Sequence, residues 1–337
     1  MISLGEQTHA NNLAVKITTD DGLEGWGECS PFLPINGESM ETGLVVGGYL
    51  KTVLSGIDAL DIENAHLLMD RTIYGNNSIK SAFDIALYDI AAQSAELPLY
   101  KFLGAKHAKQ LITDYTISFG PAGEMKDKAE YIQSLGFRII KIKLGGKPEE
   151  DIRRVRMIRE ILDSEIPLRL DANQGWSVDG AIKVLNAVSD CNVELCEEPI
   201  PRWQFMELNK VKQRSPIPIM ADESCGDHHD AQRLVDLKAC DSINIKLGKS
   251  GGLYKALKII DIAESAGMPM QIGGFLESRI GFSASAHLAM TNELIRGIDF
   301  DTPLMFSEDP VEGGIEYGGG GKITLPETMG LGARLNL

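Results

Sequence analysis

The stretch RIIKIKLGGKPEEDIRRVRMIREILDSEIPLRLD, residues 138–171, decides the fold. It begins with a short apolar run that alternates with lysines and passes through a polar, glycine-containing loop. A helical pattern follows, and the stretch ends in a second apolar run. This is the pattern of one strand and one helix followed by the next strand. Strands that alternate in this way with helices of ten or more residues are typical of a parallel sheet.

The same unit repeats from about residue 112 to Asp301. Eight strands and seven intervening helices fit this stretch, after which the chain turns to glycine-rich, β-type sequence, so the eighth helix is expected to be missing or displaced. We therefore predict an α/β protein with a modified (β/α)7β barrel of the TIM type. The expected strands are Thr113–Ser118, Arg138–Lys143, Leu168–Asp171, Val193–Glu197, Ile217–Asp222, Ser242–Lys246, Met270–Gly273 and Gly297–Asp301.

The chain before the barrel has a different pattern. A strand is expected at Leu13–Thr19, followed by an Asp-Asp-Gly turn and a second strand, and amphipathic helices are expected near 41–54 and 77–95. These elements predict a separate α+β capping domain, to which the C-terminal tail returns. The predicted parts are residues 1–109 for the capping domain, 110–302 for the barrel and 303–337 for the returning segment.

The composition excludes several classes of protein. The 337 residues are 43% apolar and carry a net charge of −15, which opposes binding to nucleic acid or to anionic lipid. No apolar run is long enough for a membrane span, and the first residues lack a signal-peptide pattern, so the expected compartment is the cytoplasm. Five cysteines without a CxxC spacing indicate neither a disulfide framework nor a zinc site. We expect a homo-oligomer with a small-molecule substrate.

Five charged residues recur at the period of the βα unit. Lys143, Asp171, Glu197, Asp222 and Lys246 are separated by 28, 26, 25 and 24 residues. Each residue ends a predicted strand, and the active site of such a barrel lies at the C-terminal ends of its strands. The spacing therefore predicts that the five side chains form one ring.

The three carboxylates of this ring end adjacent strands and would repel one another without a cation. A set of oxygen ligands suits Mg²⁺ or Mn²⁺, with water and substrate in the remaining positions. Any one of these residues alone would be read more simply as a cap for the following helix. Three consecutive strand ends, flanked by two lysines, favour a metal site.

Lys143 and Lys246 end the second and sixth strands, which lie opposite each other in an eight-stranded barrel. A lone lysine is normally a solvated surface cation. Here Lys141 and Lys143 alternate by two in KIKLG, so both are expected to point to the barrel interior. Two ammonium groups close together near a metal should lower each other's pKa, and a lysine must be neutral to act as a base.

This arrangement predicts proton transfer on a carbon next to a carboxylate. The metal would polarise the carboxylate, and metal and ammonium groups would stabilise the ene-diolate that forms. A second lysine on the opposite face could return the proton and invert the stereocentre. With one active lysine, the same intermediate could expel a leaving group or close a ring.

The motifs KIKLG (141–145), RLDANQGW (169–176), CEEP (196–199), MADES (220–224) and NIKLGKSGG (244–252) together resemble the muconate-lactonising subgroup of the enolase superfamily. The resemblance runs through nearly the whole chain. It implies one Mg²⁺ per subunit, an α+β capping domain over a (β/α)7β barrel, and a lysine base.

The resemblance also implies roles for individual residues. The implied metal ligands are Asp171, Glu197 and Asp222, with Glu197 chosen over Glu198 on this likeness. Lys143 and Lys246 would be the acid/base pair, and Lys141 would contact the substrate. Neighbouring polar residues of the same motifs, which would support the ligands, are Asn173, Glu198 and Glu223.

The segment IDFDTPLMF (298–306) narrows the expected substrate. Asp299 and Asp301 alternate onto one face and would together receive a cation. They resemble the Asp-x-Asp of the dipeptide epimerases, which implies binding of the α-ammonium group of a dipeptide whose C-terminal carboxylate binds the metal. A loop or helix cap is the simpler alternative. Glu277 and Ser278 in GGFLESR are also expected to line the pocket.

The sequence departs from this family in two ways. Epimerases of Ala-Glu carry an arginine in the first loop of the capping domain, whereas ISLGEQTHA has Gly5 and Glu6 there. An unpaired substrate anion near Glu6 would be penalised, so a small or apolar second residue is expected, as in Ala-X dipeptides. Family members also usually begin about one strand earlier, so an edge strand of the capping domain is expected to be absent.

Several alternatives share the metal and the lysines. They are N-succinylamino-acid racemisation, o-succinylbenzoate synthesis and muconate cycloisomerisation, none of which needs two carboxylates for an ammonium group. A non-catalytic metal-binding barrel is the alternative from a different class.

Overall fold

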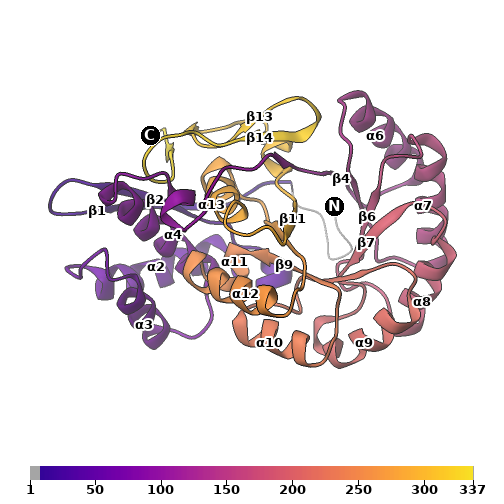
Figure 1. Ribbon diagram of the computed structural model, residues 1–337, viewed down its shortest axis with the longest axis horizontal. Helices are drawn as coiled ribbons and strands as arrows, with labels where there is room; N and C mark the ends of the chain where they lie inside the picture. Colours follow the sequence, from indigo (N-terminus) through magenta and orange to yellow (C-terminus); the bar gives the residue numbers. More distant parts are fainter. Residues whose placement is uncertain (1–7, 337) are drawn as a thin grey trace.

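The computed structural model describes residues 8–336, so the residues Gly5 and Glu6 discussed above lie outside the described part. Figure 1 shows the capping elements on one side and a ring of barrel helices on the other, with the yellow C-terminal tail lying across both. None of the described helices is long and apolar enough to cross a membrane.

Eight parallel strands form the barrel sheet, in the order β11-β10-β9-β8-β7-β6-β5-β4. A bridge between Thr113 and Ile298 links the two edges of this sheet, and the Thr113 hydroxyl accepts a hydrogen bond from the Phe300 N–H. The predicted barrel is therefore confirmed. The strands are β4 Tyr115–Ile117, β5 Ile140–Lys143, β6 Leu168–Asp171, β7 Val193–Glu197, β8 Ile219–Ala221, β9 Ser242–Lys246, β10 Met270–Gly273 and β11 Ile295–Ile298.

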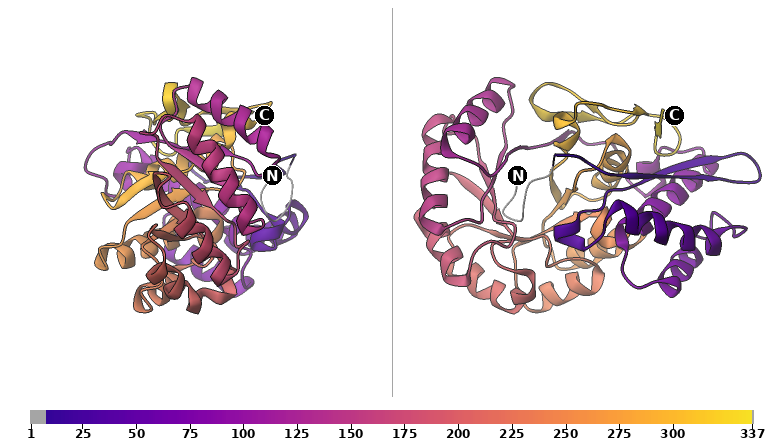
Figure 2. Two further views of the ribbon diagram at one scale, coloured as in Figure 1. Left: turned by 90° about the vertical axis from the view of Figure 1, so that its right-hand side faces the viewer. Right: turned by 180° about the vertical axis from the view of Figure 1, so that it is seen from behind.

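Helices cover the outside of this sheet, as the view from behind in Figure 2 shows. Their apolar faces are buried against the strands, for example Val155 and Ile158 of α7. The short helix α11 directly follows Lys246. The barrel helices are α6 Ala122–Ser134, α7 Pro148–Ile161, α8 Val178–Ala187, α9 Phe205–Arg214, α10 His228–Asp236, α11 Leu247–Ser250, α12 Leu253–Ser265 and α13 Arg279–Ala289, with a 3-10 turn η1 at Arg202–Gln204.

No helix follows the last barrel strand in the described chain. The 3-10 turn η2 at Thr302–Met305 comes directly after β11 and Asp299–Asp301, and the tail begins beyond it. The absence of an eighth helix was predicted. β11 ends at Ile298, earlier than expected, so Asp299 and Asp301 lie just beyond the strand. The Asp301 carboxylate accepts a hydrogen bond from the Thr116 N–H at 2.6 Å, which bends the chain toward β4 instead of extending the ladder.

The capping domain packs a two-stranded antiparallel sheet against a long buried helix. Gly25 and Gly27 permit this contact, because a Cβ atom at Gly27 would lie 1.9 Å from the Ala82 carbonyl oxygen of that helix. The elements are β1 Leu13–Thr18, β2 Glu24–Cys29, α1 Leu33–Asn36, α2 Met40–Leu54, α3 Ile62–Thr72, α4 Asn77–Ser94 and α5 Leu99–Phe102. A groove of about 800 Å³ lies between β1, α2 and α4, away from the strand ends of the barrel.

The C-terminal tail joins several parts of the chain. One pair of tail strands forms its own antiparallel ladder, and another extends to β3, which precedes the barrel. Gly330 forms a bridge with Pro98, and the Leu331 N–H donates to Asp89 of α4 at 2.7 Å. The strands are β3 Leu111–Ile112, β12 Val311–Gly313, β13 Glu316–Tyr317, β14 Lys322–Thr324 and β15 Ala333–Leu335, with a 3-10 turn η3 at Gly319–Gly321.

Candidate active site

The strand register brings the predicted charged residues to one level of the barrel. Lys143 on β5 pairs in register with Asp171 on β6, and Asp171 pairs with Glu197 on β7. Asp222 directly follows β8, and Lys246 ends β9. All three carboxylates are buried. The parallel ladders thus place residues from distant parts of the sequence around one space.

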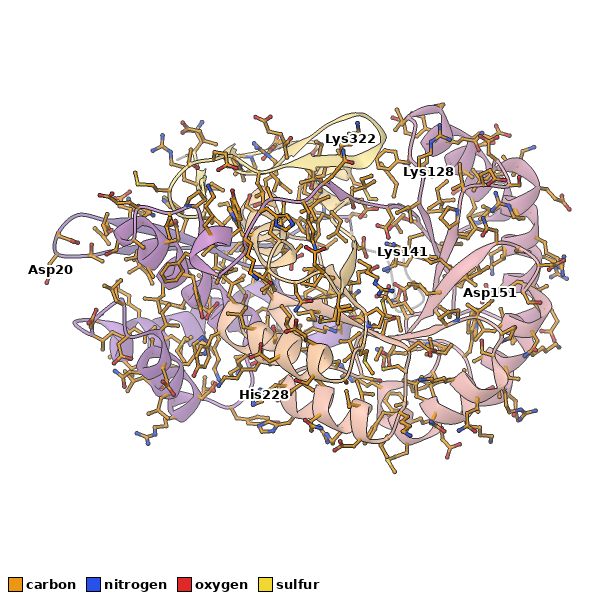
Figure 3. The ribbon with its side chains drawn as sticks, in the orientation of Figure 1. Asp20, Lys128, Lys141, Asp151, His228 and Lys322 are labelled. Carbon is orange, nitrogen blue, oxygen red and sulfur yellow. The ribbon has the colours of Figure 1, made fainter. Side chains whose placement is uncertain are left out.

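Lys141 lies at the centre of this cluster and is only 1% exposed. Figure 3 shows it inside the barrel, in contrast to His228 on the outer helices. Its Nζ atom lies 2.7 Å from Glu197 Oε2, 2.7 Å from Asp299 Oδ2 and 3.0 Å from Asp171 Oδ2. Burial alone would lower the pKa of Lys141, but the surrounding carboxylates outweigh burial and raise it well above its ordinary value.

The two outer lysines each contact one carboxylate. Lys143 Nζ lies 2.6 Å from Asp171 Oδ2, and Lys246 Nζ lies 2.8 Å from Asp222 Oδ2. Burial would lower the pKa of Lys246, yet the charges of Asp222 and Glu197 raise it above the ordinary value. The nearby Lys141 ammonium group does lower the pKa of Lys246, but the carboxylates outweigh this effect. The lowered pKa expected beside a metal ion stays a prediction.

The three carboxylates do not converge on one point. Among the described residues, no group of three or more His, Cys, Asp or Glu side chains is arranged as a formed metal site. Lysine ammonium groups lie against the carboxylates instead. The cluster nevertheless carries unbalanced negative charge: burial and the neighbouring Asp171 raise the pKa of Glu197 to about 7. Beside Asp222, the buried Glu223 Oε2 has no hydrogen-bond partner.

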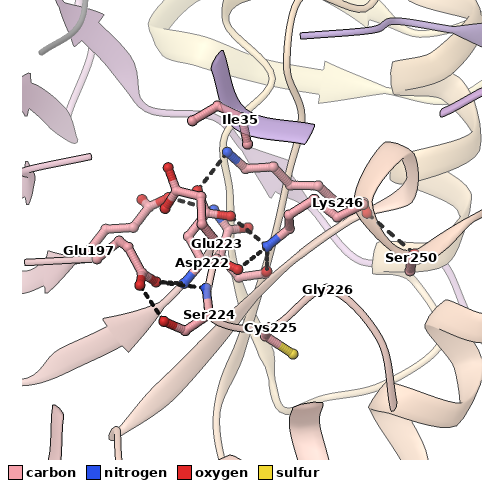
Figure 4. A network of polar contacts seen from close by, with 12 residues as sticks. Ile35, Glu197, Asp222, Glu223, Ser224, Cys225, Gly226, Lys246 and Ser250 are labelled. Carbon is pink, nitrogen blue, oxygen red and sulfur yellow. Dashed lines mark hydrogen bonds and ion pairs between the residues drawn. The ribbon is translucent and has the colours of Figure 1, made fainter. Parts of the chain in front are cut away.

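Polar neighbours hold these carboxylates in place. Glu198 accepts hydrogen bonds from the Asp222 N–H at 2.7 Å and from the Ser224 N–H and hydroxyl, which ties β7 to the end of β8. Asn173 donates from its backbone to Asp171 at 2.9 Å and from its amide to Glu223 at 3.4 Å. Figure 4 shows this network around Asp222, Glu223 and Ser224, with Ile35 of the capping domain on the other side of Lys246.

Two further supports did not emerge from the sequence. The Asn244 amide donates to Glu197 Oε1 at 2.8 Å, and the buried Lys249 lies 2.6 Å from Asp222 Oδ1. Asn244 precedes Lys246 by two residues and so shares its side of the strand, a signal that could have identified it. Lys249 lies in the short helix α11, which was not expected. The direction of the Lys249 side chain could therefore not be predicted.

Asp299 and Asp301 lie together in the wall of the pocket. Asp299 is paired with Lys141 as described. Burial would raise the pKa of Asp299, but Lys141 and Lys143 hold it below its ordinary range. Burial and the charge of Asp299 raise the pKa of Asp301 to about 7. A cation placed between the two carboxylates would relieve this repulsion.

Glu277 and Ser278 take a different position from the one expected. Neither is among the residues that line the pocket. The Ser278 hydroxyl donates to Glu28 Oε2 at 2.8 Å, and Glu277 accepts from the Phe275 N–H. Burial and the charge of Glu28 raise the pKa of Glu277 to about 8. Both side chains therefore face the capping strand β2.

The pocket between the barrel and the capping domain has a volume of about 260 Å³. Its charged residues lie at the strand ends of the barrel, and its apolar residues come from both domains. Most of the pocket residues that the sequence did not predict are these apolar ones, because loops that are distant in sequence meet here. They include Phe32 and Ile35 of the capping domain, Phe275 and Leu276 of the barrel, and Met305 and Phe306 of the segment that follows β11.

Two family models match the chain. Residues 1–104 match the mandelate racemase/muconate lactonizing enzyme N-terminal domain, and residues 124–337 match the enolase C-terminal domain-like model. The chain belongs to the mandelate racemase/muconate lactonizing enzyme family of the enolase superfamily. The resemblance drawn from the five motifs is thereby confirmed.

Members of this family with known activities are highly similar to the chain. The D-Ala-D/L-Ala epimerase of Cytophaga hutchinsonii is 55% identical over 332 residues, which are 98% of this chain and 90% of the relative. A crystal structure of the dipeptide epimerase from this organism, complexed with Mg and the dipeptide D-Ala-L-Val, matches with a TM-score of 0.98 over 99% of this chain and 91% of that chain.

A dipeptide epimerase from Enterococcus faecalis V583, complexed with Mg and L-Leu-L-Tyr, is 40% identical. It has a TM-score of 0.92 and covers 96% of this chain and 91% of that chain. These relatives are isomerases that act on amino acid derivatives. This family member is accordingly an isomerase of the racemase and epimerase class.

Proposed function

We propose that this family member is a Mg²⁺-dependent dipeptide epimerase that inverts the Cα atom of the C-terminal residue through two lysines, Lys143 and Lys246. The observation that carries the proposal is the placement of these two lysines in one pocket with Asp299 and Asp301. Lysines on two sides suit a reaction that removes a proton from one face and returns it to the other. Relatives named as dipeptide epimerases share this fold.

The metal ligands in this proposal are Asp171, Glu197 and Asp222. Their donor set fits a hard divalent cation, because all three offer buried carboxylate oxygens at the ends of adjacent strands. The unpartnered Glu223 Oε2 and the raised pKa of Glu197 indicate negative charge that such a cation would compensate. When bound, Mg²⁺, or Mn²⁺ in its place, would supply positive charge to the substrate carboxylate while the adjacent carbon loses its proton.

The protein's own side chains perform the proton transfer. The neutral form of one lysine accepts the Cα proton, and the ammonium form of the other donates a proton to the opposite face. Lys246 can lose its proton only if the charge of Asp222 is engaged elsewhere, since that charge holds the Lys246 pKa high. Lys141 remains an ammonium group, because three carboxylates surround it, and it supplies fixed positive charge beside the reacting carboxylate.

The pocket favours a small or apolar C-terminal residue. Lys143 and Lys246 are the only Lys or Arg side chains among its described lining residues, and both are assigned to the proton transfer. A substrate carboxylate side chain would have no further ammonium or guanidinium partner there. The apolar side chains of Ile35 and Met305 instead offer burial to an aliphatic group. Asp299 and Asp301 would hold the α-ammonium group.

Exchange at Cα in D₂O tests the proposal. The protein with Mg²⁺ should incorporate deuterium at Cα of the C-terminal residue of Ala-Ala and form the epimer. Lys143→Ala and Lys246→Ala should each slow exchange of one epimer by about 10²- to 10⁴-fold, the usual contribution of an acid/base group. In each variant, the other epimer should exchange faster than the epimer whose exchange is slowed.

Lys183→Ala is the matched control, since Lys183 is exposed and pairs with Glu149 on the surface. It should leave both exchange rates unchanged. Absence of exchange with a series of dipeptides, in folded protein loaded with Mg²⁺, would overturn the proposed function. Equal loss for both epimers in each lysine variant would overturn the two-lysine mechanism.

A further inference from the structure

The loop between β10 and α13 contributes Gly274, Phe275 and Leu276 to the pocket wall. The Phe275 ring lies beneath the Lys246 ammonium group, with 5.2 Å between Nζ and the ring centroid. Its other contacts include Phe32 of the capping domain, at 5.8 Å between ring centroids. The position of this loop therefore determines what surrounds the Lys246 ammonium group.

Glu28 of the capping strand β2 holds the far end of this loop. Its Oε1 atom accepts from the Ser278 N–H at 2.9 Å, and its Oε2 atom accepts from the Ser278 hydroxyl at 2.8 Å and from the Gly281 N–H at 2.8 Å. The side chain is only 6% exposed. The buried carboxylate thus lies at the first turn of α13, where backbone N–H groups lack helical partners.

Asn12 and Ser30 complete the attachment from the same domain. The Asn12 amide donates to Glu28 Oε1 at 2.8 Å and to the Leu276 carbonyl at 2.7 Å. The Ser30 hydroxyl accepts from the Leu276 N–H at 3.2 Å. The side chains of Asn12, Glu28 and Ser30 therefore bind both ends of the loop segment 276–278 to the capping domain.

The attachment concerns one of the two lysines. β10 is the direct neighbour of β9, which carries Lys246. Lys143 is on β5, which pairs with β4 and β6, and its ion pair is with Asp171 of β6. A change at Glu28 can reach Lys246 through Phe275, whereas the Lys143 ion pair lies outside this chain of contacts.

We propose that Glu28 is a positioning residue for Lys246: by fixing the loop 274–278, it holds Phe275 against the ammonium group on that face of the substrate. The proposal rests on the proposed function, because it assigns Glu28 to one of the two proton transfers. The aromatic face attracts the Lys246 Nζ atom and so favours one position of it in the pocket. Loss of the contact leaves this position less well defined and slows transfer on the Lys246 face selectively.

The test compares Cα exchange of the two epimers of Ala-Ala in D₂O. Lys246→Ala first identifies which epimer depends on Lys246. In Glu28→Gln, exchange of that epimer should fall by about two- to fivefold or more, the factor that corresponds to a lost cation–π contact, relative to exchange of the other epimer. Phe275→Leu should shift the ratio in the same direction.

Asp89→Asn is the matched control. Asp89 is also a buried carboxylate of the capping domain that accepts from backbone N–H groups, at 3.0 Å from Trp26 and 2.7 Å from Leu331, but it binds the tail. Its variant should lose stability without changing the ratio of the two exchange rates. An equal fall for both epimers in Glu28→Gln would assign Glu28 a general structural role and overturn the proposal.

A crystal structure of Glu28→Gln gives a readout that does not depend on activity. The loop 274–278 should shift and Phe275 should leave the Lys246 ammonium group. If the unaltered protein shows no exchange, the proposed function fails, and an unchanged Phe275 in this crystal structure would separately overturn the positioning role.

Discussion

At the scale of single residues, the cluster is defined by buried charges in direct contact with one another. Lys141 is in contact with three carboxylates and is almost fully buried. Removing one partner of such a group leaves an uncompensated buried charge, which costs several kcal/mol (about 3–5). Asp301 is different, because it accepts hydrogen bonds from Thr116, and burial and the charge of Asp299 raise its pKa to about 7. In the proposed function, it would receive the substrate cation together with Asp299.

Replacement of Asp301 tests this role. Asp301→Asn keeps an acceptor for the Thr116 N–H but removes the negative charge. We expect KM for Ala-Ala to rise by about ten- to a hundredfold, the contribution of one charge-assisted hydrogen bond. The preference for Ala-Ala over N-acetyl-Ala-Ala, which has no ammonium group, should fall by the same factor.

Steady-state kinetics on both substrates provide the measurement. Glu308→Gln, at an exposed position in the following segment, is the control and should leave the preference unchanged. If the Asp301→Asn variant keeps the preference for Ala-Ala over N-acetyl-Ala-Ala, the ammonium-binding role is wrong. The substrates without an ammonium group would then be favoured.

At the scale of elements, three adjacent strands supply the proposed ligands. The register aligns Asp171 with Glu197, and Glu198 binds the backbone at Asp222, directly after β8. Helices on the outside and the parallel ladder hold these strand ends at fixed separations. Lysine ammonium groups lie among the carboxylates in this structure, so metal binding is expected to compete with these ion pairs.

Thermal unfolding with and without Mg²⁺ tests the ligand assignment. A ligand that binds only the folded state at a hundred times its dissociation constant stabilises it by about 2.7 kcal/mol. We expect a corresponding rise in Tm for the unaltered protein, reversed by EDTA, and little or no rise for Glu197→Gln. The exposed Glu165→Gln control should keep the full rise. The same Mg²⁺ effect in Glu197→Gln as in the unaltered protein would contradict the assignment.

At the scale of the whole molecule, buried side chains connect the capping domain, the barrel and the tail. His287 of α13 accepts from the Tyr100 N–H through Nδ1 at 3.1 Å, and its Nε2 atom faces the Leu331 carbonyl at 3.1 Å. These partners require the neutral imidazole. Burial lowers the pKa of His287 to about 4. Protonation of the His287 side chain would therefore weaken the contacts that join the capping domain, the barrel and the tail.

The lowered pKa of His287 determines how the free energy of unfolding depends on pH. Unfolded histidine titrates near pH 6.5, so between about pH 6.5 and pH 4 the unfolded chain binds the additional proton. Stability from the neutral His287 is complete above pH 6.5 and falls as the pH drops toward 4, by about 3 kcal/mol in total. His287→Gln keeps one acceptor and one donor but does not titrate, so its unfolding free energy should depend less on pH in this range.

Urea unfolding at a series of pH values measures this difference. The exposed His107→Gln variant is the control and should retain the full dependence of the unaltered protein. Parallel pH curves for His287→Gln and the unaltered protein would show that His287 does not contribute.

The sequence alone determined the barrel, the missing eighth helix and the strand ends that carry Lys143, Asp171, Glu197, Asp222 and Lys246. These features depend on the period of one βα unit, which local patterns of apolar and polar residues set. The five motifs also identified the family. The roles of Asp171, Glu197 and Asp222 as metal ligands and of Lys143 and Lys246 as acid and base remain predictions.

Tertiary structure alone decided what surrounds each charge. The apolar pocket wall combines Phe32 and Ile35 with Phe275, and Glu28 meets Ser278 across 250 residues of sequence. No local pattern encodes such contacts, because they depend on how the capping domain docks on the barrel. The protonation of Lys246 is likewise set by the distance from Asp222 and by burial, which exist only once the chain has folded.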